Sequence, residues 1–91
     1  MAKDIDVDEQ ELYRFIQTLA AFQQLTTDKL KAVESAWTQC NESWKGASKN
    51  QFTKEFEQTK QAIEDALAAG EDASRWLERF DEIVREFEHQ Y

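Results

Sequence analysis

The chain has 91 residues, 41% of them hydrophobic and 33% charged, which allows one small domain and is typical of neither membrane-spanning nor disordered proteins. With two glycines and no proline, little interrupts helices or supplies turns, which excludes a β-sandwich and a glycine-rich phosphate loop. The formal net charge of −8 argues against nucleic acid and anionic membranes as partners, because phosphates attract basic surfaces.

The first amphipathic segment predicts a helix over about residues 8–40. No apolar stretch follows Met1-Ala2-Lys3, so we expect no ordinary signal peptide and no membrane insertion. Asp6-x-x-Glu9 and Asp8-x-x-Glu11 both fit a capping-box start. Apolar positions recur at helical spacing, with one phase step near Thr26. They are Leu12, Phe15, Leu19, Phe22, Leu30, Val33, Trp37 and Cys40, and we expect Cys40 to be a buried small hydrophobe.

The segment 41–46 predicts a bend. It reads Asn41-Glu42-Ser43-Trp44-Lys45-Gly46, in which asparagine and serine compete with the helical backbone and glycine permits a chain reversal. Ser48-x-x-Gln51 fits a second capping box. A break this short joins antiparallel neighbours, so the predicted fold class is all-α, an antiparallel two-helix hairpin.

The second segment, about 47–90, predicts a longer helix with a heptad stripe. Its positions alternate steps of four and three: Phe52, Phe56, Thr59, Ile63, Ala66, Gly70, Ala73, Leu77, Phe80, Val84, Phe87 and Tyr91. A second row lies one residue before the first: Ala62, Ala69, Trp76 and Ile83. The apolar face is therefore three positions wide, which favours a bundle of about four helices over a lone hairpin.

Unequal arms predict a dimer. Folding the chain at Ser43 places Asp8 opposite about Arg79, so the end of the second helix would project beyond its partner and need a cover. Two hairpins packed antiparallel would cover it and set the acidic ends near the mildly basic bend. Gly70 predicts a close helix approach, within or between chains. The expected dimer interface comprises Ala66, Gly70, Trp76, Phe80, Phe87 and Tyr91.

The Trp44-x-Gly46 tripeptide at the bend, in a chain of this length, resembles the WXG family of small ESAT-like proteins. The resemblance implies helical hairpins that dimerise and leave the cell through type VII secretion systems. It assigns Trp44 and Gly46 to a recognition surface, whereas the residues alone also allow Trp44 simply to plug its own bundle end. The family's aromatic residue followed four positions later by an acid is missing here. The nearest substitutes are Leu77 with Asp81 and Val84 with Glu88.

No catalytic constellation, cofactor site or metal site is expected. One cysteine and one histidine cannot make a four-ligand zinc site, and Glu86-x-x-His89 occurs once. The predicted function is therefore a non-enzymatic secreted protein or secretion adaptor, acting with type VII machinery or a co-secreted protein. The alternative is a cytoplasmic scaffolding hairpin that is not exported. A third option is one half of a heterodimer with another hairpin.

Overall fold

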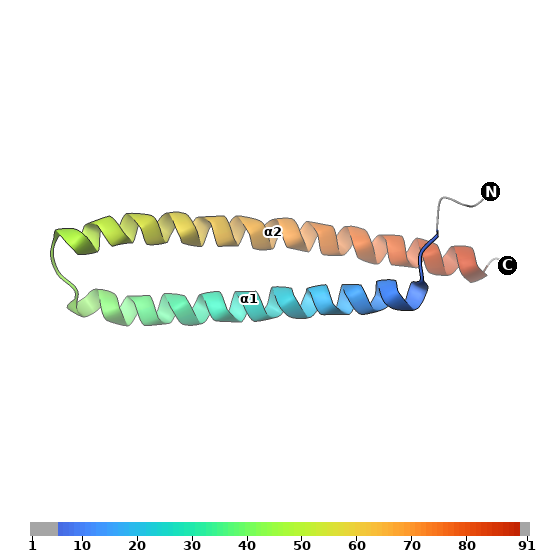
Figure 1. The fold of residues 1–91 in the computed structure, drawn as a ribbon, viewed down its shortest axis with the longest axis horizontal. Helices are drawn as coiled ribbons and strands as arrows, with labels where there is room; N and C mark the ends of the chain where they lie inside the picture. Colours follow the sequence, from blue (N-terminus) through green and yellow to red (C-terminus); the bar gives the residue numbers. More distant parts are fainter. Residues whose placement is uncertain (1–5, 90–91) are drawn as a thin grey trace.

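The computed structural model describes residues 6–89. Two helices lie side by side and antiparallel: α1 spans Glu9–Ser43 and α2 spans Ala47–His89 (Figure 1). The first turn of α1 and the last turn of α2 lie at one end of the rod, which we call the open end, and the bend lies at the other (Figure 1). The all-α hairpin predicted from the two amphipathic segments is confirmed.

The helix ends follow local chemistry. The Asp8 side chain caps α1, because its Oδ1 accepts hydrogen bonds from the backbone N–H groups of Gln10 at 2.9 Å and Glu11 at 3.1 Å. α1 continues to Ser43, three residues beyond the predicted end. α2 begins at Ala47, so Ser48 already lies inside the helix and the second capping box is wrong.

The buried core lies near the open end, and the prediction that the end of α2 projects beyond α1 at Val84 is wrong. Leu12, Ile16 and Val84 are buried, with Leu77 and Phe80 packed partly buried against them. Val84 is fully enclosed although we expected it to project beyond α1. Because α1 runs on to Ser43, the reversal moves toward Gly46, and Glu9 then lies opposite Arg85, whereas the predicted register placed Asp8 opposite about Arg79. Phe87 is half-buried, and Tyr91 lies outside the described residues.

The buried face of α1 changes register after Thr26. Beyond this point the half-buried positions are Leu30, Glu34, Trp37 and Asn41, whereas Val33 and Cys40 are exposed. Glu34 reaches across to Lys60, with Oε2 2.9 Å from Nζ, and this hydrogen bond and its charge raise the pKa of Lys60. The predicted burial of Cys40 is therefore wrong, because a cross-helix ion pair replaces an apolar contact in the seam.

Gly70 lies where the two helices meet within one chain. A Cβ built on Gly70 would come within 2.5–2.8 Å of the amide end of Gln23 on α1. The Gln23 Nε2 lies 3.4 Å from the carbonyl oxygen of Leu67, one turn before Gly70, and donates to it. The glycine thus makes room for a polar side chain that crosses from α1 to the backbone of α2.

Gly70→Ala should change the free energy of unfolding by less than about 0.5 kcal/mol. Alanine gains about 1 kcal/mol of helix propensity, and displacing the Gln23 amide loses one neutral hydrogen bond of about 1 kcal/mol. Urea unfolding should show the full gain of about 1 kcal/mol when Gly70→Ala is added to Gln23→Ala. A loss above about 2 kcal/mol in the single variant would mean that Gln23 cannot move aside.

Candidate functional site

The bend owes its shape to Gly46. Trp44 ends α1 in an extended conformation, with φ −92° and ψ 125°, and Gly46 has φ 108°, a left-handed value that favours glycine. A Cβ on Gly46 would meet no atom within 4 Å. The glycine is therefore required for the backbone reversal and makes no room for a close neighbour in the hairpin.

Trp44 belongs to an aromatic cluster that closes the bend end of the hairpin. Its ring centroid lies 6.1 Å from that of Trp37 and 5.6 Å from that of Phe52. Trp37 in turn lies 5.4 Å from Phe56 on α2. The indole Nε1 of Trp44 donates to Ser48 Oγ at 3.3 Å. The half-buried Trp44 is held in place by its own chain and still presents part of its ring to solvent.

The C-terminal residues expected to take part in recognition are largely internal. Leu77 is half-buried, Asp81 is 7% exposed and Val84 is not exposed at all. Asp81 Oδ2 pairs with Arg85 Nη2 at 3.0 Å, while Oδ1 is buried without a hydrogen-bond partner among the described residues. The Glu88 side chain lies outside the described part. The structure thus brings Leu77, Asp81 and Val84 together, but against α1.

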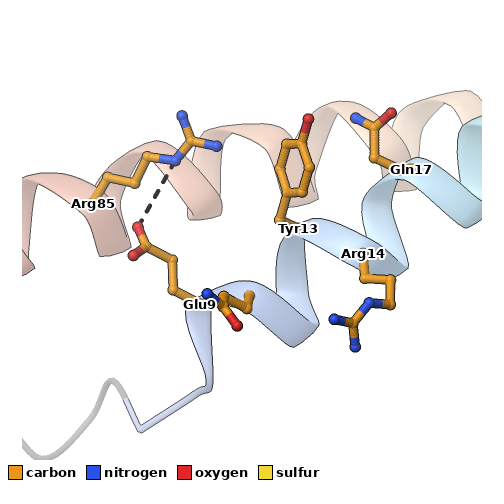
Figure 2. Close-up of a pocket in the computed structure, with 6 residues that line it drawn as sticks. Glu9, Tyr13, Arg14, Gln17 and Arg85 are labelled. Carbon is orange, nitrogen blue, oxygen red and sulfur yellow. Dashed lines mark ion pairs between the residues drawn. The ribbon is translucent and has the colours of Figure 1, made fainter.

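A depression at the open end is lined by both helices. Figure 2 shows Arg85 on α2 reaching toward Glu9 on α1, with Tyr13 beside it. Arg85 Nε lies 3.8 Å from Glu9 Oε2, and its guanidinium carbon lies 5.8 Å from the centroid of the Tyr13 ring. Because Glu9 and Asp81 both neutralise Arg85, this depression is no anion site. The Arg85–Glu9 pair joins the two helix ends.

Six of the nine exposed large hydrophobic side chains among the described residues lie on one face of the hairpin, which we call the uncharged face. Trp76 is 57% exposed, Ile83 53%, Phe22 60% and Val33 50%. On α2 this face follows the two predicted apolar rows, which contain no charged residue, and at its α1 edge the exposed Lys29 lies between Phe22 and Val33. Its exposed residues are Phe15, Phe22 and Val33 of α1 and Phe52, Thr59, Ala62, Ala66, Ala69, Ala73, Trp76 and Ile83 of α2.

Only some residues of the predicted dimer interface lie on the uncharged face. Ala66 and Trp76 are exposed, whereas Gly70 and Phe80 are half-buried between the helices. The sequence stripe of α1 had not separated the exposed Phe15 and Phe22 from the buried positions. The signal that could have separated them is Ile16, which follows Leu12 by four residues and belongs to the seam.

The described residues offer no other chemistry of note. Within residues 6–89, no group of three histidine, cysteine, aspartate or glutamate side chains could hold a metal ion. As far as the structure describes them, neither helix has the long apolar stretch needed to cross a membrane. Cys40 is an exposed free thiol. These findings leave binding surfaces as the features that call for explanation.

Comparison with known proteins agrees with the bend and the hairpin. No curated protein and no solved structure matched the chain. A family model described as proteins of 100 residues with WXG matches residues 4–89, which is nearly the whole chain and includes Trp44 and Gly46. The chain therefore belongs to the WXG100 family.

Proposed function

We propose that this protein acts by binding alone, as a homodimer of hairpins that pack antiparallel into a four-helix bundle. The dimer serves as a small substrate of a type VII secretion system, or as the adaptor that escorts one. Membership in the WXG100 family supports the secretion role. Export by this route needs no signal peptide.

The uncharged face is the observation that carries this proposal. Three hydrophobic residues are buried within the described chain, Leu12, Ile16 and Val84, while nine large ones are exposed, six of them on this face. Each such side chain gains roughly 1.5–3 kcal/mol on full burial. A contiguous apolar surface of this kind marks an interface, and a face that runs the length of the hairpin matches a partner of the same length.

The bend and the open end would form one recognition surface in such a dimer. Antiparallel packing places the open end of one hairpin beside Trp44 and Gly46 of its partner. The partly exposed Trp44 ring then lies near the last turns of α2, which carry Leu77, Asp81, Val84 and Glu88. Because Asp81 and Val84 already contact their own α1, Trp44 supplies the accessible part of this surface.

One observation favours the alternative, a cytoplasmic scaffolding hairpin that is not exported. Trp44 packs on Trp37 and Phe52 and donates to Ser48, all within its own chain. A residue with these contacts can serve the fold alone. The two functions differ in whether the exposed edge of Trp44 is recognised by another protein.

Trp44→Ala distinguishes them. Under the secretion proposal, this variant keeps its helix content and dimer mass but loses export by cells that carry a type VII system. The matched control is Trp37→Ala, which removes a half-buried ring of the same cluster that lies outside the uncharged face. Each variant should lose about 1–3 kcal/mol of stability, because the rings are only partly buried. Normal export of Trp44→Ala, or equal loss in both variants, would favour the scaffold.

A further inference from the structure

The uncharged face contains a hollow near the bend. It encloses about 220 Å³ between α1 and α2, and only apolar atoms face it. Leu30 and Val33 form its α1 wall, and Thr59 and Ile63 form part of its α2 wall. The stems of Lys29 and Lys60 complete its rim. This hollow is shaped for an apolar side chain and holds none from its own chain.

The same face carries a large aromatic projection toward the open end. Trp76 is 57% exposed and stacks on Phe80, with centroids 5.4 Å apart and planes inclined by 13°. Phe80 follows Thr59 by three heptads, so the pair lies on the row of α2 that borders the hollow. One face of each molecule thus offers both a hollow and an exposed Trp76 ring, held in place by Phe80, that could fill it.

A single two-fold axis would bring the hollow of one copy against the Trp76 ring of the other. If Trp76 of one copy enters the hollow beside Thr59 of the other, the axis crosses α2 midway, between Leu67 and Ala68. The exposed residues on either side are Ala66 and Ala69, small enough for two helices to approach closely. Small residues therefore occupy the crossing that this register requires.

Two further observations agree with the register. The same axis would place Phe52 of one copy beside Ile83 of the other, so that each covers the other. These side chains are 41% and 53% exposed in the separate hairpin. The antiparallel arrangement also sets residues 61–91, which carry nine acids and three bases, beside residues 12–60, which carry seven bases and five acids. A parallel arrangement would instead place the two hollows over each other and leave both unfilled.

We propose that each hairpin seats its Trp76 ring, backed by Phe80, in the hollow of a second copy, and that the two α2 helices cross at Ala66 and Ala69. The contact occurs twice in the dimer, once on each side of the axis. This inference rests on the homodimer proposed above and adds the residues and the register by which the copies recognise each other.

Cysteine cross-linking tests the register in the full chain with Cys40→Ser. The proposed two-fold axis that brings Trp76 of one copy beside Thr59 of the other also brings Ala73 of one copy beside Ala62 of the other. Both alanines are exposed. We expect a mixture of the Ala62→Cys and Ala73→Cys variants to form a covalent dimer on mild oxidation. Either variant alone should stay largely unlinked, because its two copies would lie about 16 Å apart along the helix.

A double-mutant cycle tests the contact itself. Trp76→Ala should raise the dimer dissociation constant about 30-fold, as expected for a central aromatic anchor. Val33→Ala, in the wall of the hollow, should weaken the dimer in the wild-type background but have at least fivefold less effect once Trp76 is absent. Val33 is 50% exposed, so this truncation spares the hairpin.

The outcomes separate the two proposals. A dimer in which only the mixture cross-links, with coupled effects of Trp76→Ala and Val33→Ala, supports the register. A dimer whose mixture stays unlinked, or whose two truncations act independently, overturns the register and leaves the homodimer standing. A chain that is monomeric before any substitution overturns both.

Discussion

Val84→Asp is expected to unfold the open half of the hairpin. Val84 is fully buried against Leu12 and Ile16, and Asp81 lies one turn away on α2. A carboxylate at this site has no cation to pair with inside the core, so its burial should cost more than about 4 kcal/mol. That is most of the stability of a small domain. Hydrogen exchange should show lost amide protection over residues 9–19 and 77–87.

Ile83→Asp is the matched control, because it makes the same change one residue earlier. Ile83 is 53% exposed on the uncharged face, so its aspartate stays in water in the separate hairpin. We expect this variant to keep the amide protection of the open half while its molar mass shifts toward the monomer. Equal loss of protection in both variants would contradict the assignment of Val84 to the core and Ile83 to the interface.

Ala69→Glu is expected to separate the dimer without unfolding the hairpin. In a symmetric antiparallel dimer, each substitution occurs twice near the crossing, so two like charges would face each other as water is excluded. The dissociation constant should rise at least 100-fold, about 2.7 kcal/mol. Helix content should stay unchanged, because glutamate is nearly as good a helix former as alanine. Sedimentation velocity and circular dichroism would measure both.

Gln58→Glu provides the control for this charge. Gln58 is exposed on α2 outside the two rows of the uncharged face, with Lys54 one turn before it. The added carboxylate should therefore leave the dissociation constant within about twofold of the wild-type value. If Gln58→Glu and Ala69→Glu weakened the dimer equally, the added charge itself, and not the uncharged face, would account for the effect.

The sequence predicted α2 better than α1, for a physical reason. The heptad stripe of α2 has no interruption, so its apolar face can be followed along the whole helix. In α1 the buried face shifts after Thr26, where Glu34 enters the seam to pair with Lys60. A charged residue in a seam cannot be told from a solvated one by spacing alone, because its partner lies on the other helix.

The projection of α2 beyond α1 could not be predicted reliably from the apolar spacing, because it depended on the residue at which the chain reverses. Asn41 and Ser43 are poor helix formers, yet the helix continues through them to Trp44, whose ring packs on Trp37 and Phe52. Tertiary packing thus overrode local propensity. The chain reverses about one turn of helix later than predicted, and α1 therefore buries Val84. The apolar side chains that still need a cover lie along the side of the hairpin and not at the end of α2.

The candidate site was predicted in part. The motif placed Trp44 and Gly46 at the bend, and the second apolar row of α2 identified Trp76 and Ile83, which are exposed. The burial of Asp81 beneath α1 could not be foreseen, since it depends on where α1 lies along α2, and the spacing of a carboxylate does not show whether it lies in the seam. Residues that share a face of one helix are visible in the sequence, whereas ion pairs between helices are not.

Sedimentation equilibrium of the wild-type chain at micromolar concentration tests the central claim that a second copy covers the uncharged face. We predict a molar mass twice the 10.7 kDa of one chain, with the helix content of the intact hairpin. A fully helical species of 10.7 kDa, stable at the same concentration, would contradict the claim, because the apolar side chains of that face would then remain in water.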